Sequence, residues 1–112
     1  MIFYGTNLYI QNGTGSTGEL NGKGNLIVGY GATDGGLDRT GSHNIIVGDN
    51  HSYSSHAGIA SGDSQVLAGA YSAAIAGTGN QAVGDNAGVF GGQYNTAQGD
   101  TSTIFGGGYN HA

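Results

Sequence analysis

The sequence lacks cysteine, proline and tryptophan, and only 2 of its 112 residues are Lys or Arg. Without cysteine no disulfide can stabilise the chain, and zinc sites built on cysteine are excluded. The low basic content disfavours a nucleic-acid partner, since Lys and Arg neutralise phosphates, and it disfavours binding to an anionic membrane surface. No apolar run is long enough to cross a bilayer, so we expect no direct membrane insertion. The N-terminal residues lack the pattern of a signal peptide.

Glycine supplies 25 residues, and 7 Asp or Glu give a formal net charge of -5. High glycine content is typical of flexible linkers, but here regularly spaced glycines separate short runs of Val, Ile, Leu and Phe, which favours an ordered fold. Glycine loses much backbone entropy on folding and buries no side chain. Small domains without a large core need disulfides, metals or oligomerisation. Because cysteine is absent and no strong metal motif is present, the composition favours oligomerisation.

From Gly62 onward the sequence repeats with a unit of about fifteen residues. The glycines that mark the repeat are spaced alternately by seven and eight residues: Gly62, Gly69, Gly77, Gly84, Gly92, Gly99 and Gly107. Each half of the unit holds a short strand-like run before the next glycine, which is too short for a helix. A repeat that stacks like residues in register is typical of a β-solenoid, with coils about 4.8 Å apart.

Stacking the repeats predicts columns of like residues along the solenoid. Two apolar columns belong to one half of the unit: Ala60, Ile75, Phe90 and Phe105, and beside it Ile59, Ala74, Val89 and Ile104. The other half has a small apolar column of Leu67, Ala82, Ala97 and Ala112. Just before it comes an amide column of Gln65, Asn80, Asn95 and Asn110. Stacked amides can hydrogen-bond to one another along the solenoid axis.

Upstream of Gly62 the repeat is irregular. Residues 25–29 and 44–48 are near copies whose glycines lie nineteen residues apart, roughly one coil plus four. We interpret residues 30–43 as a loop insertion and residues 49–58 as another long turn. Residues 1–23 do not fit the repeat, and we predict a strand over residues 3–11 within a segment that caps the open end. The expected organisation is therefore a capping segment at 1–23 followed by solenoid repeats at 24–112.

The repeat units resemble the heads of a known family. Residues 73–77 (AAIAG), 80–84 (NQAVG) and 95–99 (NTAQG) are similar to the SxAxG and SVAIG strands of YadA-like heads of trimeric autotransporter adhesins. Residues 22–30, and 41–48 with 51–55, look like openings of such heads. The resemblance covers residues 22–112 and implies an all-β, left-handed parallel β-roll assembled as a homotrimer. The unit of about fifteen residues exceeds the family's commonest fourteen, which a bulge or a wider turn in each coil would explain.

The resemblance also implies a function. We expect an extracellular trimeric adhesin head or fibre module that attaches to a surface, or to a host or prey partner, through a protein or glycan receptor. The expected location is the bacterial cell surface, with this chain as a fragment of a longer exported protein. The alternative is a purely structural spacer of a surface or phage-like fibre, with no ligand of its own.

No motif indicates catalysis, a cofactor or a metal site. There is no GxSxG sequence and no phosphate-binding loop. The spacing of His51 and His56 matches no usual zinc motif, although one His per chain on a threefold axis would bring three imidazoles together. Asp85 and Asp100 share a column, but the calcium-binding nonapeptide is not repeated, and Asp is a usual turn residue. We therefore expect no enzyme activity, no cofactor and no bound metal.

The departures from the repeat are the candidate binding sites, because loops on a rigid scaffold carry recognition. The candidate partner-binding residues are Tyr30, Asp34, Asp38, Arg39, His51, Tyr53 and His56. The opposing interpretation is that these loops only cap the solenoid and lock chains together, with Asp38 and Arg39 as an intersubunit ion pair. The sequence leaves these two interpretations equally open.

Overall fold

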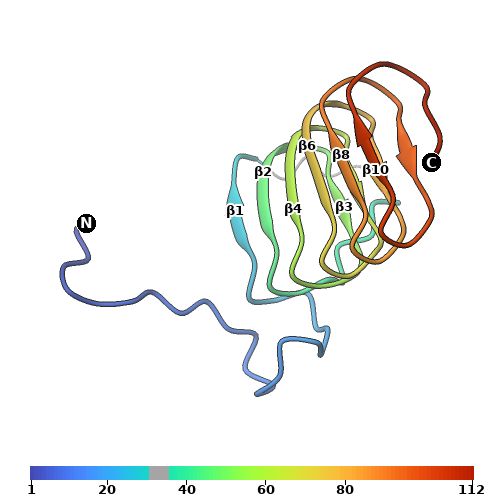
Figure 1. Cartoon of the computed structure of the whole chain (residues 1–112). Helices are drawn as coiled ribbons and strands as arrows, with labels where there is room; N and C mark the ends of the chain where they lie inside the picture. The colour runs from blue at the N-terminus through green and yellow to red at the C-terminus, as the bar shows by residue number, and fades with distance from the viewer. Residues whose placement is uncertain (31–35) are drawn as a thin grey trace.

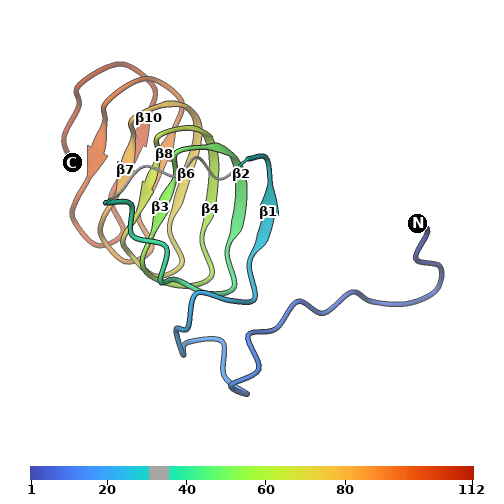
Figure 2. The ribbon, with the colours of Figure 1, turned by 180° about the vertical axis from the view of Figure 1, so that it is seen from behind.

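The computed structural model describes residues 1–30 and 36–112. The described residues from β1 (Leu26–Val28) to the C-terminus form a solenoid whose coils stack side by side (Figure 1), and the view from behind shows the same arrangement (Figure 2). The predicted all-β solenoid is confirmed. None of the described residues belongs to a helix long and apolar enough to cross a membrane.

Two parallel sheets form opposite walls of the solenoid. The six-stranded sheet has the order β1 (Leu26–Val28), β2 (Ile45–Asp49), β4 (Ile59–Asp63), β6 (Ala73–Thr78), β8 (Gly88–Phe90) and β10 (Thr103–Phe105). The four-stranded sheet has the order β3 (Ser52–Tyr53), β5 (Val66–Leu67), β7 (Gln81–Ala82) and β9 (Thr96–Ala97). All paired strands are parallel because each coil returns the chain to the same side before the next strand begins.

A narrow core lies between the two sheets. Strand side chains alternate between the interior and the outer surface. The six-stranded sheet contributes the inward column Ile46, Ala60, Ala74, Val89 and Ile104. The four-stranded sheet contributes Tyr53, Leu67, Ala82 and Ala97. All of these residues are buried, so the predicted column of Leu67, Ala82 and Ala97 is confirmed.

The predicted apolar columns are wrong at their first members. Ala60 pairs with Ala74 rather than Ile75, and Ile59 pairs with Ala73 rather than Ala74. Downstream the predicted pairing is confirmed, since Ala74 pairs with Val89 and Ile75 with Phe90. The error arises because the spacing from Ala60 to Ala74 is fourteen residues, not fifteen.

A bulge supplies the fifteenth residue of the later coils. The register between β4 and β6 shifts between Ser61 and Asp63, so that β6 contains one more residue than β4 over the same span. Three residues at this position in successive coils have positive φ: Ala76 (φ 63), Gly91 (φ 85) and Gly106 (φ 76). Of the two explanations considered for the longer unit, the structure therefore shows a bulge.

The amide column is a continuous hydrogen-bonded ladder, as predicted. The Oδ1 atom of Asn80 accepts hydrogen bonds from the backbone N–H and the Nδ2 of Asn95, both at 3.1 Å. The Oδ1 atom of Asn95 accepts the corresponding pair from Asn110 at 2.9 and 3.0 Å. Each buried amide thus satisfies the backbone of the following coil, where an apolar side chain would leave a polar group unpaired.

Glycines mark where successive coils approach most closely. Gly77 has φ 83, and a Cβ atom there would overlap the carbonyl oxygen of Gly92 in the next coil. Gly62 stands in the same relation to the carbonyl oxygen of Gly77. The periodic glycines of this column are therefore needed for the close packing of one coil on the next, and not only for the turn.

Two predictions for the N-terminal part of the solenoid are wrong. The strand expected over residues 3–11 is not formed, and β1 at Leu26–Val28 is the first strand of the chain. Residues 49–58 are not a long turn, because they contain β3, which pairs with β5 in regular register. The coil that contains β3 has the fourteen-residue spacing from Ile46 to Ala60, so it lacks the bulge but is otherwise regular.

Candidate interaction surfaces

The outward side of the six-stranded sheet is an exposed apolar surface. Its two outward columns, here called the apolar face, consist of Leu26, Ile45, Ile59, Ala73, Gly88 and Thr103, and of Val28, Val47, Ser61, Ile75, Phe90 and Phe105. None of these residues is charged. Ile59 in the middle of the sheet is 41% exposed, and Phe105 is 81% exposed. An uncharged surface that exposes several large apolar side chains in this way is typical of an interaction site.

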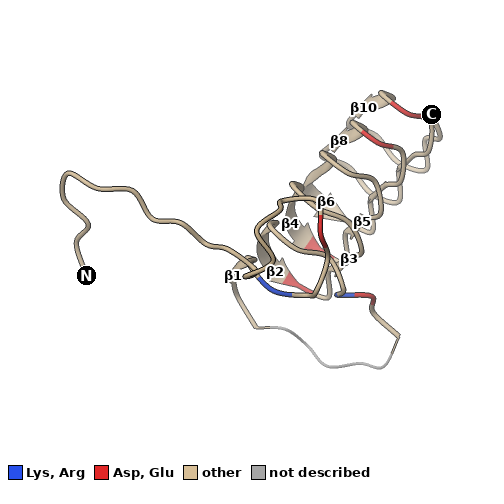
Figure 3. Ribbon diagram, turned by 90° about the horizontal axis from the view of Figure 1, so that it is seen from below, with Lys and Arg blue, Asp and Glu red and all other residues tan. Residues whose placement is uncertain are grey.

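The outward side of the four-stranded sheet is more polar. Its paired outward residues are Ser52, Val66, Gln81 and Thr96. The charged residues of the described chain lie in turns, loops and strand ends, as Figure 3 shows by colour. The two faces of the solenoid therefore differ in chemistry, and only the six-stranded side presents a surface that water solvates poorly.

Aromatic side chains stack along the later coils. Phe90 and Phe105 on the apolar face have ring centroids 5.1 Å apart in a stacked arrangement. Tyr94 and Tyr109, at a neighbouring turn, stack at 5.3 Å. The repeat predicts that Phe90 and Phe105 share a column, and the register of β8 and β10 confirms this pair. Stacking of like residues follows from the repeat itself and requires no ligand.

The loop that precedes β2 lies against the first coil. The backbone N–H of Tyr53 donates to the carbonyl oxygen of Asp38 at 2.6 Å, and Gly41 N–H donates to the carbonyl oxygen of Tyr53 at 3.0 Å. The hydroxyl of Ser52 accepts a hydrogen bond from the Asp38 N–H at 3.1 Å. Residues 38–41 therefore satisfy the outer edge of β3, which otherwise has only β5 as a neighbour.

The carboxylate of Asp38 stabilises the turn of this loop. It accepts hydrogen bonds from the hydroxyl of Thr40 at 2.6 Å and from the Thr40 N–H at 3.0 Å. These two hydrogen bonds, the hydroxyl one first, lower the pKa of Asp38 below its ordinary value. The Asp38 carboxylate is thus engaged within its own loop in the single chain.

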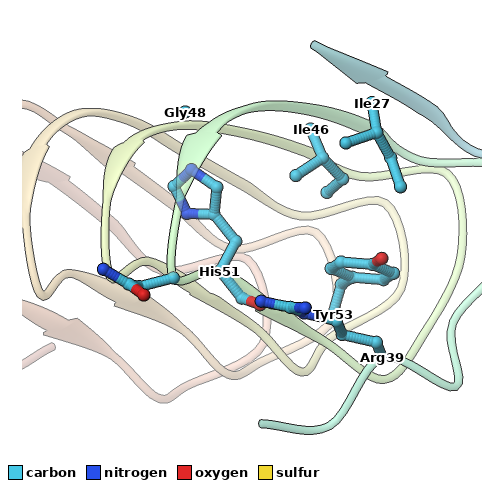
Figure 4. Close-up of a pocket in the computed structure, with 7 residues that line it drawn as sticks. Ile27, Arg39, Ile46, Gly48, His51 and Tyr53 are labelled. Carbon is cyan, nitrogen blue, oxygen red and sulfur yellow. The ribbon is translucent and has the colours of Figure 1, made fainter. Parts of the chain in front are cut away.

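Arg39 reaches from the loop toward the interior of the first coil. Its Nε donates to the carbonyl oxygen of His51 at 3.2 Å. Together with Ile27, Ile46 and Tyr53 it lines a cavity of about 110 Å³ at the end of the core (Figure 4). The cavity lies where the inward side of β1 has no opposite strand among residues 1–30 and 36–112, since the first strand of the four-stranded sheet there is β3.

His51 occupies a place in the amide ladder. Its Nδ1 accepts the backbone N–H of Gln65 at 3.2 Å, which places the ring proton on Nε2, and Nε2 donates to the carbonyl oxygen of Val47 at 2.8 Å. Asn80 makes the same two contacts in a later coil, to the carbonyl oxygen of Ala76 and to the N–H of Asn95. His51 is therefore a structural equivalent of the ladder amides.

We expect His51→Asn to lower the free energy of unfolding by less than about 1.5 kcal/mol, since the asparagine can form both hydrogen bonds. His51→Leu should cost more, because it leaves the buried Gln65 N–H without an acceptor. Chemical denaturation of the two variants measures the difference. Equal losses of stability would show that the imidazole contributes packing alone.

Two of the predicted partner-binding residues, His51 and Tyr53, lie in the interior of the first coil, where they are 2% and 5% exposed. Tyr30 is 88% exposed, Asp38 is exposed, and Arg39 is half-buried. Asp34 lies outside the described residues. The predicted residues thus do not form one common surface.

His56 lies at a turn on the opposite corner from the amide ladder and is half-buried. Its ring makes an edge-to-face contact with Tyr71 of the next coil, with centroids 5.0 Å apart. Within residues 1–30 and 36–112, no three His, Asp or Glu side chains gather in a group that could hold a metal ion. The side chains of Asp85 and Asp100 accept backbone N–H groups of Ala70 and Asp85 from the preceding coils, at 2.8 and 3.0 Å.

Sequence reasoning did not identify the apolar face as a candidate site. The signal was present, because a strand whose inward residues are already apolar has no need of apolar outward residues in a water-exposed sheet. Ile45, Ile46 and Val47 are such a run, and only the middle residue is buried.

Comparisons with known proteins returned no relative. No protein-family model matches the chain, and neither any curated protein nor any solved structure matches it significantly.

Proposed function

We propose that this chain is the head module of a homotrimeric extracellular fibre and that it mediates attachment to a surface. The observation that supports self-association is the apolar face, an uncharged surface that spans all six strands of the larger sheet. A solvated antiparallel or parallel sheet face normally carries polar residues. Covering this face with copies of itself would add the apolar burial that the narrow, alanine-rich core supplies poorly.

Three copies are proposed rather than two because of the resemblance to YadA-like heads. Closed cyclic symmetry presents the same surface of every chain to a common axis. With the apolar faces directed toward a threefold axis, the four-stranded sheets and the turns would form the outer surface. The outer surface would then display each turn three times, so that weak contacts to a protein or glycan gain from multivalency.

Oligomerisation is tested by light scattering of the intact chain and of Ile59→Lys. Ile59 lies centrally on the apolar face, and a lysine there would be buried without a partner in a trimer. We expect a trimer for the intact chain and a dissociation constant at least about tenfold higher for the variant. Val66→Lys, on the outward side of the four-stranded sheet, is the matched control and should remain trimeric. A monodisperse monomer at high concentration, or a dimer, contradicts the proposed assembly.

The spacer alternative has one observation in its favour. Asp38 and Arg39 hold the loop on the first coil, and His51 and Tyr53 belong to the interior, so that few of the predicted recognition residues are available. Binding of the trimer to glycan and matrix-protein arrays separates the two functions. Adhesion that is lost in Tyr30→Ser, with the trimer retained, supports a head. Absence of binding to every array member supports a spacer.

A further inference from the structure

The N-terminal arm, defined as residues 1–10, is apolar and uncovered. Its apolar side chains are all exposed: Met1, Ile2, Phe3, Tyr4, Leu8, Tyr9 and Ile10. It contains no charged side chain. Among the described residues, its hydrogen bonds are local ones, from Thr6 to Asn7 and from Asn7 to Tyr9. A segment of this composition gains free energy by burial against another apolar surface.

The arm leaves the solenoid from a fixed point next to β1. Asn12 is buried; its N–H donates to Nε2 of His43 at 3.2 Å, and its Nδ2 donates to the carbonyl oxygen of Glu19 at 2.6 Å. Asn21 donates to the carbonyl oxygen of Asn12 at 3.0 Å. Because Asn12 is held by these contacts, the arm begins at a defined position and does not start from a free linker.

The base of the arm already lies over the apolar face. Leu8 and Ile10 line a shallow hollow together with Leu26 and Ile45, which are the first two residues of one outward column. Beyond this point Figures 1 and 2 both show the arm leading away from β1, with the N-terminus well separated from the solenoid. The base of the arm therefore lies beside Leu26 of the chain's own β1, whereas the N-terminal end of the arm extends away from the solenoid.

β1 is the least covered strand of the six-stranded sheet. It pairs only with β2, so one of its two edges has no strand partner among the described residues. Ile27 is 48% exposed, although its equivalents in the later coils are buried. An apolar strand with an open edge readily accepts an additional extended segment.

We infer that the N-terminal arm of one copy packs across β1 of a second copy of this chain. Both surfaces are uncharged and apolar, and both are exposed in the single chain. Ten extended residues span about 30 Å, which is enough to reach a neighbouring solenoid. This inference rests on the proposed self-association and adds an exchanged element to it. Each copy gives an arm to one neighbour and receives an arm from another, so the contact closes with the symmetry of the assembly.

Cysteine cross-linking tests the exchange, because the natural chain contains no cysteine. Chains with Tyr4→Cys and size-tagged chains with Val28→Cys are unfolded together, refolded and oxidised. We expect a disulfide-linked species of one tagged and one untagged chain on a non-reducing gel. Tagged Val66→Cys replaces Val28→Cys in the control and should give only the collisional background. A yield equal to this background overturns the inference. A chain that carries both Tyr4→Cys and Val28→Cys and forms the disulfide within itself would overturn the inference as well.

Removal of residues 1–10 provides an independent measurement. We expect the dissociation constant of the assembly to increase at least about tenfold. Replacement of Thr6 and Asn7 by alanine keeps the apolar residues and should leave the assembly unchanged. If the intact chain associates and is sensitive to Ile59→Lys, but the truncated chain associates equally well, the inference fails and the proposed function stands. If the intact chain is monomeric, the proposed function fails, and the arm exchange fails with it.

Discussion

Gly77→Ala is expected to lower the free energy of unfolding by about 2–5 kcal/mol per chain. Part of this cost, about 1–2 kcal/mol, comes from placing an L-residue in the left-handed region at φ 83. The remainder arises because the new Cβ overlaps the Gly92 carbonyl oxygen of the next coil and lies 3.0 Å from Nδ2 of Asn80. Neither neighbour can move freely, since the carbonyl belongs to backbone and the amide belongs to the ladder.

Gly91→Ala is the matched control for this prediction. Gly91 has nearly the same backbone conformation, with φ 85, but a Cβ there has no neighbouring atom within 4 Å. Only the conformational cost applies, and Ala76 shows that an alanine is accommodated at the same place in the preceding coil. Thermal and chemical denaturation of both variants separates the two contributions. Equal losses of stability would show that φ alone makes the glycine column necessary.

Asn80→Ala is expected to cost about 2–4 kcal/mol, because the buried N–H of Asn95 loses its acceptor and a cavity remains. Asn80 is fully buried, and its Nδ2 also donates to the carbonyl oxygens of Ala76 and Gly92 at 3.2 and 3.1 Å. Loss of these contacts weakens the corner that joins three successive coils. The effect should therefore exceed that of a surface amide by a wide margin.

Gln81→Ala is the control for the ladder prediction. Gln81 follows Asn80 directly, but its side chain is exposed on the outward side of β7. A substitution at such a position normally changes stability by less than about 0.5 kcal/mol. Urea titration of both variants gives the comparison. A similar midpoint for Asn80→Ala and Gln81→Ala would mean that water replaces the ladder contacts without loss.

The repeat period and the amide column could be predicted because their side chains repeat with the coil. Glutamine and asparagine recur at the same place, and only the hydrogen bonds had to be added. The role of His51 in the ladder could not be predicted, because a histidine is not an amide and so does not match the other residues of the column. Its Nδ1 acceptor and Nε2 donor nevertheless reproduce the two functions of Asn80. A ladder position is thus defined by donor and acceptor geometry and not by residue type.

The wrong prediction that Ala60 pairs with Ile75 had a different cause. The extra residue at Ala76 looks like any other alanine in the run of residues 73–76, so the sequence does not show that it bulges. The equivalent residues Gly91 and Gly106 do carry a signal, since each forms a double glycine with the residue that follows. The alignment of these doublets with Ala76 and Gly77 would have located the bulge and separated the fourteen-residue coils from the fifteen-residue coils.

The apolar face and the N-terminal arm were missed for a physical reason. Apolar character in a sequence indicates burial, but it does not indicate against what. In the core the partner is the opposite sheet of the same chain, as for Ile46. On the outward side Ile45 and Val47 remain exposed in the single chain. Patterns within one sequence therefore predict which strands form, but not which surface covers their outward residues.

Successive fifteen-residue coils carry the bulge at the same position, so the solenoid could be lengthened or shortened by whole coils. Residues 77–91 and 92–106 begin at equivalent glycines and contain the same ladder, turn and bulge positions. Recombination between the two equivalent points would remove or add fifteen residues and leave every remaining hydrogen-bond column continuous. Each such event would shorten or extend the module by about 4.8 Å. The length of the solenoid could thus change in steps of one coil, and the added or remaining coils would use the same contacts between coils as before.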